Sequence, residues 1–94
     1  MKIRQVRHRG LRRLLEDGDE RGIRRELLPR VRNILTALVS AADIDGVRGP
    51  PGWNVYRLSG GRAGTWSIRV SGNWRITFDC EGDEISNLDL EDYH

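Results

Sequence analysis

The amino-acid sequence predicts an α+β fold, in which two N-terminal helices pack on one face of a small antiparallel sheet of about four strands. Up to about residue 42, apolar residues recur at spacings of three and four, as in amphipathic helices. From residue 55 onward they alternate with polar residues, as in half-buried strands. Glycine and proline in DIDGVRGPPG, residues 43–52, separate the two patterns. A chain of 94 residues is expected to form a single domain, residues 1–94.

The first helix is predicted over residues 9–17. Its leucines have the spacing of one helix face: Leu11, Leu14 and Leu15. Gly18 follows, and glycine commonly ends a helix. Residues 2–8, KIRQVRH, alternate only imperfectly, so we expect a short edge strand or an extended lead-in there.

The main helix is predicted from about Glu26 to Ala42. Its apolar stripe, which we expect to form core, consists of Ile23, Leu27, Val31, Ile34, Leu35, Leu38 and Val39. Pro29 interrupts the stripe, but the first turn of a helix tolerates proline because its N–H groups have no partner within the helix. A kinked helix that begins near Arg24 is the alternative.

Strands are predicted at 55–59, 65–70, 73–80 and 85–92. Gly72 and Asn73 suit a two-residue type II′ hairpin turn, and EGDE at 81–84 is expected to form the next turn. The glycine-rich segment GGRAG, residues 60–64, is expected to be a loop. The strands should therefore form an antiparallel meander.

Helices on one face would leave the other face of the sheet open. The apolar side chains expected to face the helices are Trp66, Ile68, Val70, Trp74, Ile76 and Phe78. Alternation then directs Arg69 and Arg75 onto the open face, with Arg57 and Arg62 at its border. These residues would form a cationic patch, unless they are ordinary solvated surface charges.

Charge is distributed unevenly along the chain. Residues 1–32 contain eleven basic residues against five acidic ones, a net charge of +6, and residues 33–78 contain five against two, or +3. Residues 79–94 contain no basic residue and seven acidic ones, a net charge of −7. Fifteen of the sixteen basic residues are arginine, which binds phosphate groups bidentately. The composition favours a polyanionic partner, although a GC-rich genome would also enrich arginine.

Several classes of site lack support in the sequence. No CxxC, no HExxH and no histidine pair at ligand spacing occurs, so neither a metal nor a cofactor is expected. GGRAG has no following GK[ST], which argues against a nucleotide-triphosphate loop, and no spacing supports a serine triad. Cys80 lies on the inward phase of its strand, which favours a buried structural thiol over a nucleophile.

The same reasoning predicts the cellular compartment. Cys80 has no second cysteine to pair with, no apolar stretch has membrane-spanning length, and MKIRQVRHRG lacks the apolar segment of a signal peptide. We therefore expect a reduced, cytoplasmic protein that does not bind a membrane.

The remaining features are sufficient for metal-free RNA cleavage. The 2′-hydroxyl of RNA can attack the neighbouring phosphate if a protein supplies a proton acceptor, a proton donor and cations. The chain ends on Asp92, Tyr93 and His94, and histidine can transfer protons near neutral pH. Asp92 and the terminal carboxylate favour the imidazolium form. A module that binds RNA without cutting it is the alternative.

The segment GPPGWNVYRLSGGRAGTWSIRVSGNWRITF and the terminal DLEDYH resemble the HigB-type killer toxins of the RelE superfamily. The N-terminal RHRGLRRLLEDGDERGI is similar to the opening helix and loop of that family. The resemblance implies the RelE-like fold and an endoribonuclease that cuts messenger RNA on the ribosome. It also implies a cognate HigA-type helix-turn-helix antitoxin, which we expect to contact the basic N-terminal half rather than the acidic last strand.

The resemblance also implies roles for individual residues. Arg75 matches the arginine of NWRITF, expected to hold the scissile phosphate, and the terminal DYH is expected to position and protonate the RNA. Tyr56 and Ser59 stand where many members have histidine and lysine, which removes two possible proton or charge carriers. The positions expected to bind RNA or its phosphates are Arg57, Arg62, Arg69, Tyr56 and Ser59.

We therefore expect His94 to be the main proton-transfer group and Arg75, with Arg69, to stabilise charge on the phosphate. Arg57 or Arg62 could replace the missing cation, but arginine is a poor proton donor. Three other uses of the scaffold stay open: a weakened toxin held by its antitoxin, a gyrase-directed toxin, and an RNA-binding protein that does not cut.

Overall fold

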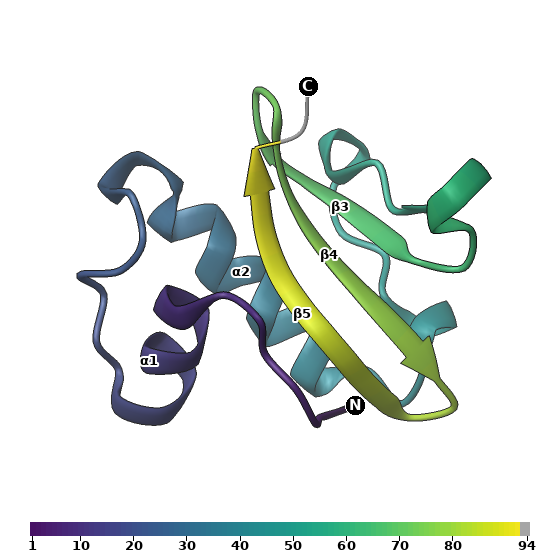
Figure 1. The fold of residues 1–94 in the computed structure, drawn as a ribbon, viewed down its shortest axis with the longest axis horizontal. Coiled ribbons are helices and arrows are strands. Elements are labelled where there is room, and N and C mark those ends of the chain that lie inside the picture. Colours follow the sequence, from purple (N-terminus) through teal and green to yellow (C-terminus); the bar gives the residue numbers. More distant parts are fainter. Residues whose placement is uncertain (93–94) are drawn as a thin grey trace.

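The computed structural model describes residues 1–92, and here two α-helices pack against one face of a five-stranded sheet (Figure 1). The α-helices are α1 (Arg9–Asp17) and α2 (Leu28–Ser40). The strands are β1 (Lys2–Ile3), β2 (Tyr56–Arg57), β3 (Trp66–Ser71), β4 (Trp74–Glu81) and β5 (Glu84–Asp92). Short 3-10 turns are η1 (Arg25–Leu27), η2 (Ile44–Gly46), η3 (Pro51–Trp53) and η4 (Gly60–Arg62). The predicted α+β class is confirmed. Neither helix has the length and apolar content to cross a membrane within this part of the chain.

The sheet has the order β1-β5-β4-β3-β2. The strands from β2 to β5 are antiparallel neighbours, as predicted, whereas β1 pairs with β5 in parallel. The amide of Lys2 donates to the carbonyl of Asp83 at 2.7 Å, and that of Arg4 donates to Ile85 at 2.7 Å. The N-terminal lead-in therefore supplies a fifth strand, and β5 lies in the interior of the sheet.

Helix α1 begins and ends where the sequence predicts. The Nδ1 atom of His8 accepts a hydrogen bond from the amide of Leu11 at 3.1 Å, which caps the N-terminus. Gly18 ends the helix in the left-handed conformation, with φ of 70°. A Cβ on Gly10 would lie 2.3 Å from the carbonyl oxygen of Gly22, so only glycine permits this close approach of α1 to the following loop.

Helix α2 is slightly shorter than predicted. Pro29 lies in its first turn, and the predicted start at Glu26 falls within η1. The helix ends before the predicted Ala42, where the chain becomes extended. Near this end, the amine of Met1 donates to the carbonyl of Leu38 at 3.0 Å. The N-terminus thus partners one of the last carbonyls of the helix, which have no partner within it.

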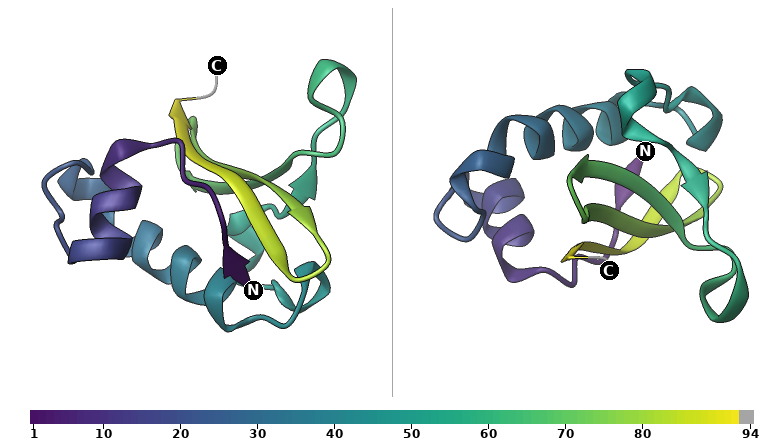
Figure 2. Two further views of the ribbon diagram at one scale, coloured as in Figure 1. Left: turned by 60° about the horizontal axis from the view of Figure 1, so that its bottom comes forward. Right: turned by 90° about the horizontal axis from the view of Figure 1, so that it is seen from above.

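The hydrophobic core lies between the helices and one face of the sheet, while no α-helix of residues 1–92 covers the other face (Figure 2). The fully buried core side chains are Leu11, Val31, Ile34, Leu38, Ile68, Val70, Ile76, Phe78, Ile85 and Leu88. Full burial of an aliphatic or phenyl side chain stabilises a fold by about 1.5–3 kcal/mol. The apolar stripe of α2 and the alternating residues of β3 and β4 therefore meet as expected, except that the prediction is wrong for Val39, which is 53% exposed. The polar residues of the strands lie on the open face, where Ser67 and Thr77 are nevertheless buried.

Irregularities interrupt the strand pairing at two places. Between β3 and β4 the register shifts after Arg69, and Gly72, with φ of 55°, begins the two-residue turn. Between β4 and β5 the register shifts after Thr77, close to Asn87, which has a left-handed φ of 53°. The strand predicted at residues 85–92 is therefore confirmed, but a bulge at Asn87 inserts an extra residue into it.

Candidate functional site

Two arginines lie opposite each other on the open face of the sheet. The Cα atoms of Arg69 and Arg75 are register partners across β3 and β4. The adjacent pair, Ile68 and Ile76, is fully buried under the helices, so alternation directs both arginines to the other face, as predicted. The Nε atom of Arg69 donates to the carbonyl of Gly72 at 3.3 Å. Like charges at facing positions repel, and an anion bound between them would relieve that repulsion.

Arg75 is the member of this pair whose guanidinium has unsatisfied N–H groups in the described part of the chain. Its side chain is half-buried, and its Nε and Nη1 atoms are buried without a hydrogen-bond partner in residues 1–92. Buried N–H groups that lack a partner cost about 1–3 kcal/mol each, and more when charged. A phosphate oxygen that accepted these hydrogen bonds would remove this cost, and it would reach the buried atoms only after the Arg75 side chain or its neighbours move.

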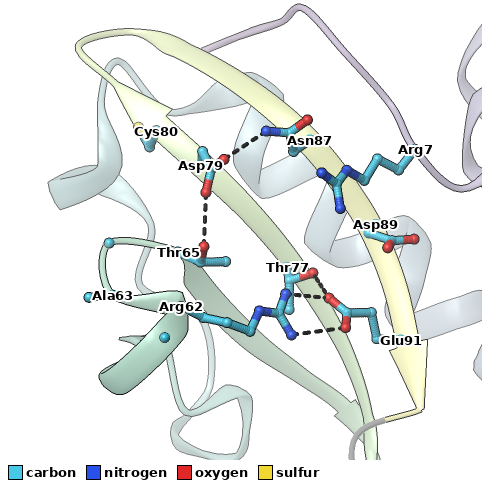
Figure 3. A pocket seen from close by; sticks show the side chains of 12 residues that line it. Arg7, Arg62, Ala63, Thr65, Thr77, Asp79, Cys80, Asn87, Asp89 and Glu91 are labelled. Atoms are coloured by element: carbon cyan, nitrogen blue, oxygen red, sulfur yellow. Dashed lines mark hydrogen bonds and ion pairs between the residues drawn. The ribbon is translucent and has the colours of Figure 1, made fainter.

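Glu91 faces Arg75 from the neighbouring strand β5, but its carboxylate forms hydrogen bonds with other residues. Its Cα is the register partner of Arg75. The carboxylate accepts two hydrogen bonds from Arg62, Nη1 at 3.0 Å and Nη2 at 2.7 Å, and a third from the hydroxyl of Thr77 (Figure 3). The hydrogen bond from Arg62, more than the one from Thr77, holds the pKa of Glu91 below its usual range.

A hollow of about 500 Å³ adjoins this ion pair, between the loop at residues 60–64 and strands β4 and β5 (Figure 3). Its polar lining consists of Arg7, Arg62, Thr65, Thr77, Asp79, Asn87, Asp89 and Glu91. Asp79 accepts hydrogen bonds from Thr65 at 3.0 Å and from Asn87 at 2.7 Å, so its oxygens are engaged. The open face is therefore of mixed charge, with three carboxylates beside the expected arginines.

Arg57 does not border the arginine pair as predicted. It is the register partner of Trp66, whose side chain packs against the hydrophobic core. The Arg57 guanidinium carbon lies 5.6 Å from the centre of the Trp66 ring, a cation–π contact. Facing residues point to the same side of a sheet, so Arg57 lies on the side opposite to Arg69 and Arg75.

The structure brings some of the other predicted residues to the site. Tyr56 is exposed and faces Ser67 in the register, which places it on the open face. Ser59 is exposed and directly precedes η4, which carries Arg62. Asp92 ends β5 but is not brought to the arginine pair: its register partner Trp74 packs against the hydrophobic core, so Asp92 lies on the side of the sheet opposite to Arg75. The predicted Tyr93 and His94 lie outside the described residues.

Sequence reasoning missed Glu91, Thr77 and Asn87 as members of this site. The spacing of Ile85 and Leu88, three residues apart within a predicted strand, was a signal for the bulge at Asn87. No sequence signal links Glu91 to Arg62, which lies 29 positions earlier in a loop. The pairing depends on the fold of that loop over the sheet.

Cys80, the one cysteine of the chain, also lines the hollow beside the Arg62–Glu91 ion pair. Cys80 is half-buried rather than fully buried, and burial, followed by the nearby Asp43, raises the pKa of its thiol. A raised pKa disfavours the nucleophilic thiolate. Within residues 1–92, no three His, Cys, Asp or Glu side chains are grouped so that they could hold a metal ion.

Comparison with known proteins gives two findings. The profile of a family described as RelE-like toxin of type II toxin-antitoxin system HigB matches residues 4–94. The Endoribonuclease HigB of Proteus vulgaris is 36% identical over 92 residues, which cover 98% of this chain and 99% of that protein. The family match therefore extends over both α-helices, strands β2 to β5 and the terminal DYH.

Proposed function

Because this chain belongs to the HigB-like, RelE-type toxins of type II toxin–antitoxin systems, we propose that it is an endoribonuclease that cuts messenger RNA on the ribosome. In the proposed reaction the 2′-oxygen of a nucleotide attacks the adjacent phosphorus, and the bond from phosphorus to the 5′-oxygen breaks. One group accepts the 2′-hydroxyl proton and another protonates the 5′-oxygen. The products are a 2′,3′-cyclic phosphate and a 5′-hydroxyl, and no metal takes part.

The observation that carries this proposal is the state of Arg75. It combines a permanent positive charge with two buried N–H groups that lack a partner in residues 1–92, on a rigid strand of an uncovered sheet face. Arg69, which faces it, adds a second charge. Such fixed donors stabilise the additional negative charge that the phosphate carries in the transition state.

The proton transfers are assigned to the end of the chain. We assign the main proton-transfer role to His94, and assign Asp92 and Tyr93 to positioning the RNA, in keeping with the terminal DYH of the family. The support from the described residues is limited to β5 itself, whose Glu91 faces Arg75 one position before Asp92. Tyr56, exposed on the same face, can stack on an unpaired base, and Ser59 can bond a phosphate.

The proposal is tested by mapping cleavage of a defined messenger RNA by the purified protein, with and without ribosomes. We expect new 5′ ends inside codons only when ribosomes are present, and these ends should require phosphorylation before ligation because they carry 5′-hydroxyls. A protein that binds RNA but yields no new ends would contradict the proposal. DNA breaks in cells without RNA cleavage would instead identify a gyrase poison.

For the cognate HigA-type helix-turn-helix antitoxin, we propose docking in a groove of about 260 Å³ beside α1. Its lining is Ile3, Arg4, Val6, Arg12, Leu15 and Glu16. Leu15 is 38% exposed and contributes an apolar side chain to this groove beside Ile3 and Val6. Because residues 1–32 carry eleven basic and five acidic residues, or +6, the occupant is expected to be an acidic amphipathic segment of the antitoxin.

Replacing Leu15 with glutamate should weaken antitoxin binding at least about tenfold, since the new charge repels an acidic segment and the apolar contact is lost. Val39→Glu is the matched control, because Val39 is 53% exposed on α2 and does not line the groove. Both variants should still cleave RNA. Calorimetry that gives Leu15→Glu the affinity of the unaltered protein, or an antitoxin bound solely along β5, would show that the groove is not the docking site.

A further inference from the structure

Glu91 is the carboxylate that faces Arg75 across the β4–β5 strand pair. The two residues are register partners on one face of neighbouring antiparallel strands, where Cβ atoms lie about 4.5–5.5 Å apart. Both side chains are long enough to meet from these positions. Yet the Nε and Nη1 atoms of Arg75 have no hydrogen-bond partner in the described part of the chain.

The Glu91 carboxylate is held away from Arg75 by the contacts described above. Arg62 approaches with two guanidinium nitrogens, at 3.0 and 2.7 Å, and the buried hydroxyl of Thr77 binds the same carboxylate. Bidentate pairs of this kind fix direction as well as distance. The bonds from Arg62 therefore compete with the bonds that Glu91 could make to its neighbour on β4.

We infer that the Arg62–Glu91 ion pair keeps Glu91 from neutralising Arg75, so that the Arg75 guanidinium stays available to an RNA phosphate. Arg62 and Glu91 are then positioning residues that act through Arg75, and this role rests on the proposed function. Glu91 also anchors the loop at residues 60–64, because Arg62 at the end of η4 contacts the sheet through it.

Loss of the Arg62 side chain should therefore weaken RNA binding indirectly, by changing which residue Glu91 contacts. Without it, the Glu91 carboxylate can turn to the guanidinium of Arg75, which faces it across the strand pair. Arg62→Ala would then remove one positive charge directly and mask a second one. A second substitution, Glu91→Gln, removes the masking carboxylate, and the double variant has the same net charge as the unaltered protein.

The experiment measures binding of an RNA with a 2′-deoxy nucleotide at the cleavage position, by fluorescence anisotropy at constant salt. Arg62→Ala should weaken binding by about tenfold or more. The double variant Arg62→Ala/Glu91→Gln should recover to within about threefold of the unaltered protein, and Glu91→Gln alone should bind at least as well as it. Arg4→Ala is the matched control, because Arg4 forms a similar exposed pair with Glu84. It should weaken binding far less than Arg62→Ala.

A double variant that binds as weakly as Arg62→Ala would overturn the inference, because Arg62 would then contact the RNA directly. A second readout does not need RNA: the side-chain Nε–H resonance of Arg75 should shift in Arg62→Ala and return in the double variant. If the Arg75 resonance is the same in Arg62→Ala as in the unaltered protein, the inference is also overturned. If the unaltered protein fails to cleave RNA, the proposed function fails, while the resonance still reports whether Glu91 reaches Arg75.

Discussion

Arg75→Ala is expected to abolish growth arrest on induction and to lower kcat/KM for messenger RNA by about 100- to 1,000-fold, the usual cost of losing one preorganised charge-stabilising donor. The guanidinium has two buried N–H groups without a partner in residues 1–92 and faces a second arginine, so it is suited to a phosphate rather than to the fold. Cleavage kinetics on ribosome-bound RNA would measure the loss.

The fold itself should survive this change. Removing a buried cation with unpaired N–H groups removes a desolvation cost, so the midpoint of thermal unfolding should stay the same or rise in Arg75→Ala. Arg75→Lys should retain part of the activity, because it keeps the charge but not the planar fork. An alanine variant that remains fully toxic, or that is active but unstable, would show that Arg75 is a structural residue.

His94→Ala is expected to lower the cleavage rate by about 100- to 10,000-fold, the range for a positioned proton-transfer group. The expectation rests on the terminal DYH of the family and on the position of β5, whose residue 91 faces Arg75. The pH profile of kcat should lose the limb that reports a histidine, whose ordinary pKa is about 6.5.

His8→Asn is the control for this substitution. His8 is the other histidine of the chain, and its Nδ1 caps α1. Asparagine is among the best N-cap residues, so the helix and the cleavage rate should both be retained. The role of His94 would be refuted by an alanine variant that keeps the full rate together with the histidine limb of the profile.

The fold was largely predictable because local periodicity determines most of it. The 3.6-residue spacing located α1 and α2, and two-residue alternation placed Arg69 and Arg75 on the uncovered face. The parallel pairing of β1 with β5 could not be predicted, because it joins residues about eighty positions apart and leaves no local pattern. The bulge at Asn87 was missed because one left-handed residue reverses alternation without breaking the strand.

The candidate site was predictable only in part, because it depends on contacts between elements that are distant in the sequence. Alternation is a property of one strand, so it identifies which side chains share a face but not how neighbouring elements use them. Arg57 was misplaced because the register of the short strand β2 sets it beside Trp66. The contact of Arg62 with Glu91 depends on how a loop with three glycines folds over the sheet, which no spacing in the chain encodes.

The position of β5 between β1 and β4 has a consequence for how the protein forms during translation. Because β5 follows every other element, neither flanking strand can complete its pairing until the ribosome has synthesised the end of the domain. Non-local pairing of this kind also slows folding. The nascent chain therefore emerges without an assembled open face, so a nuclease directed at translation would not be competent while its own message is still being read.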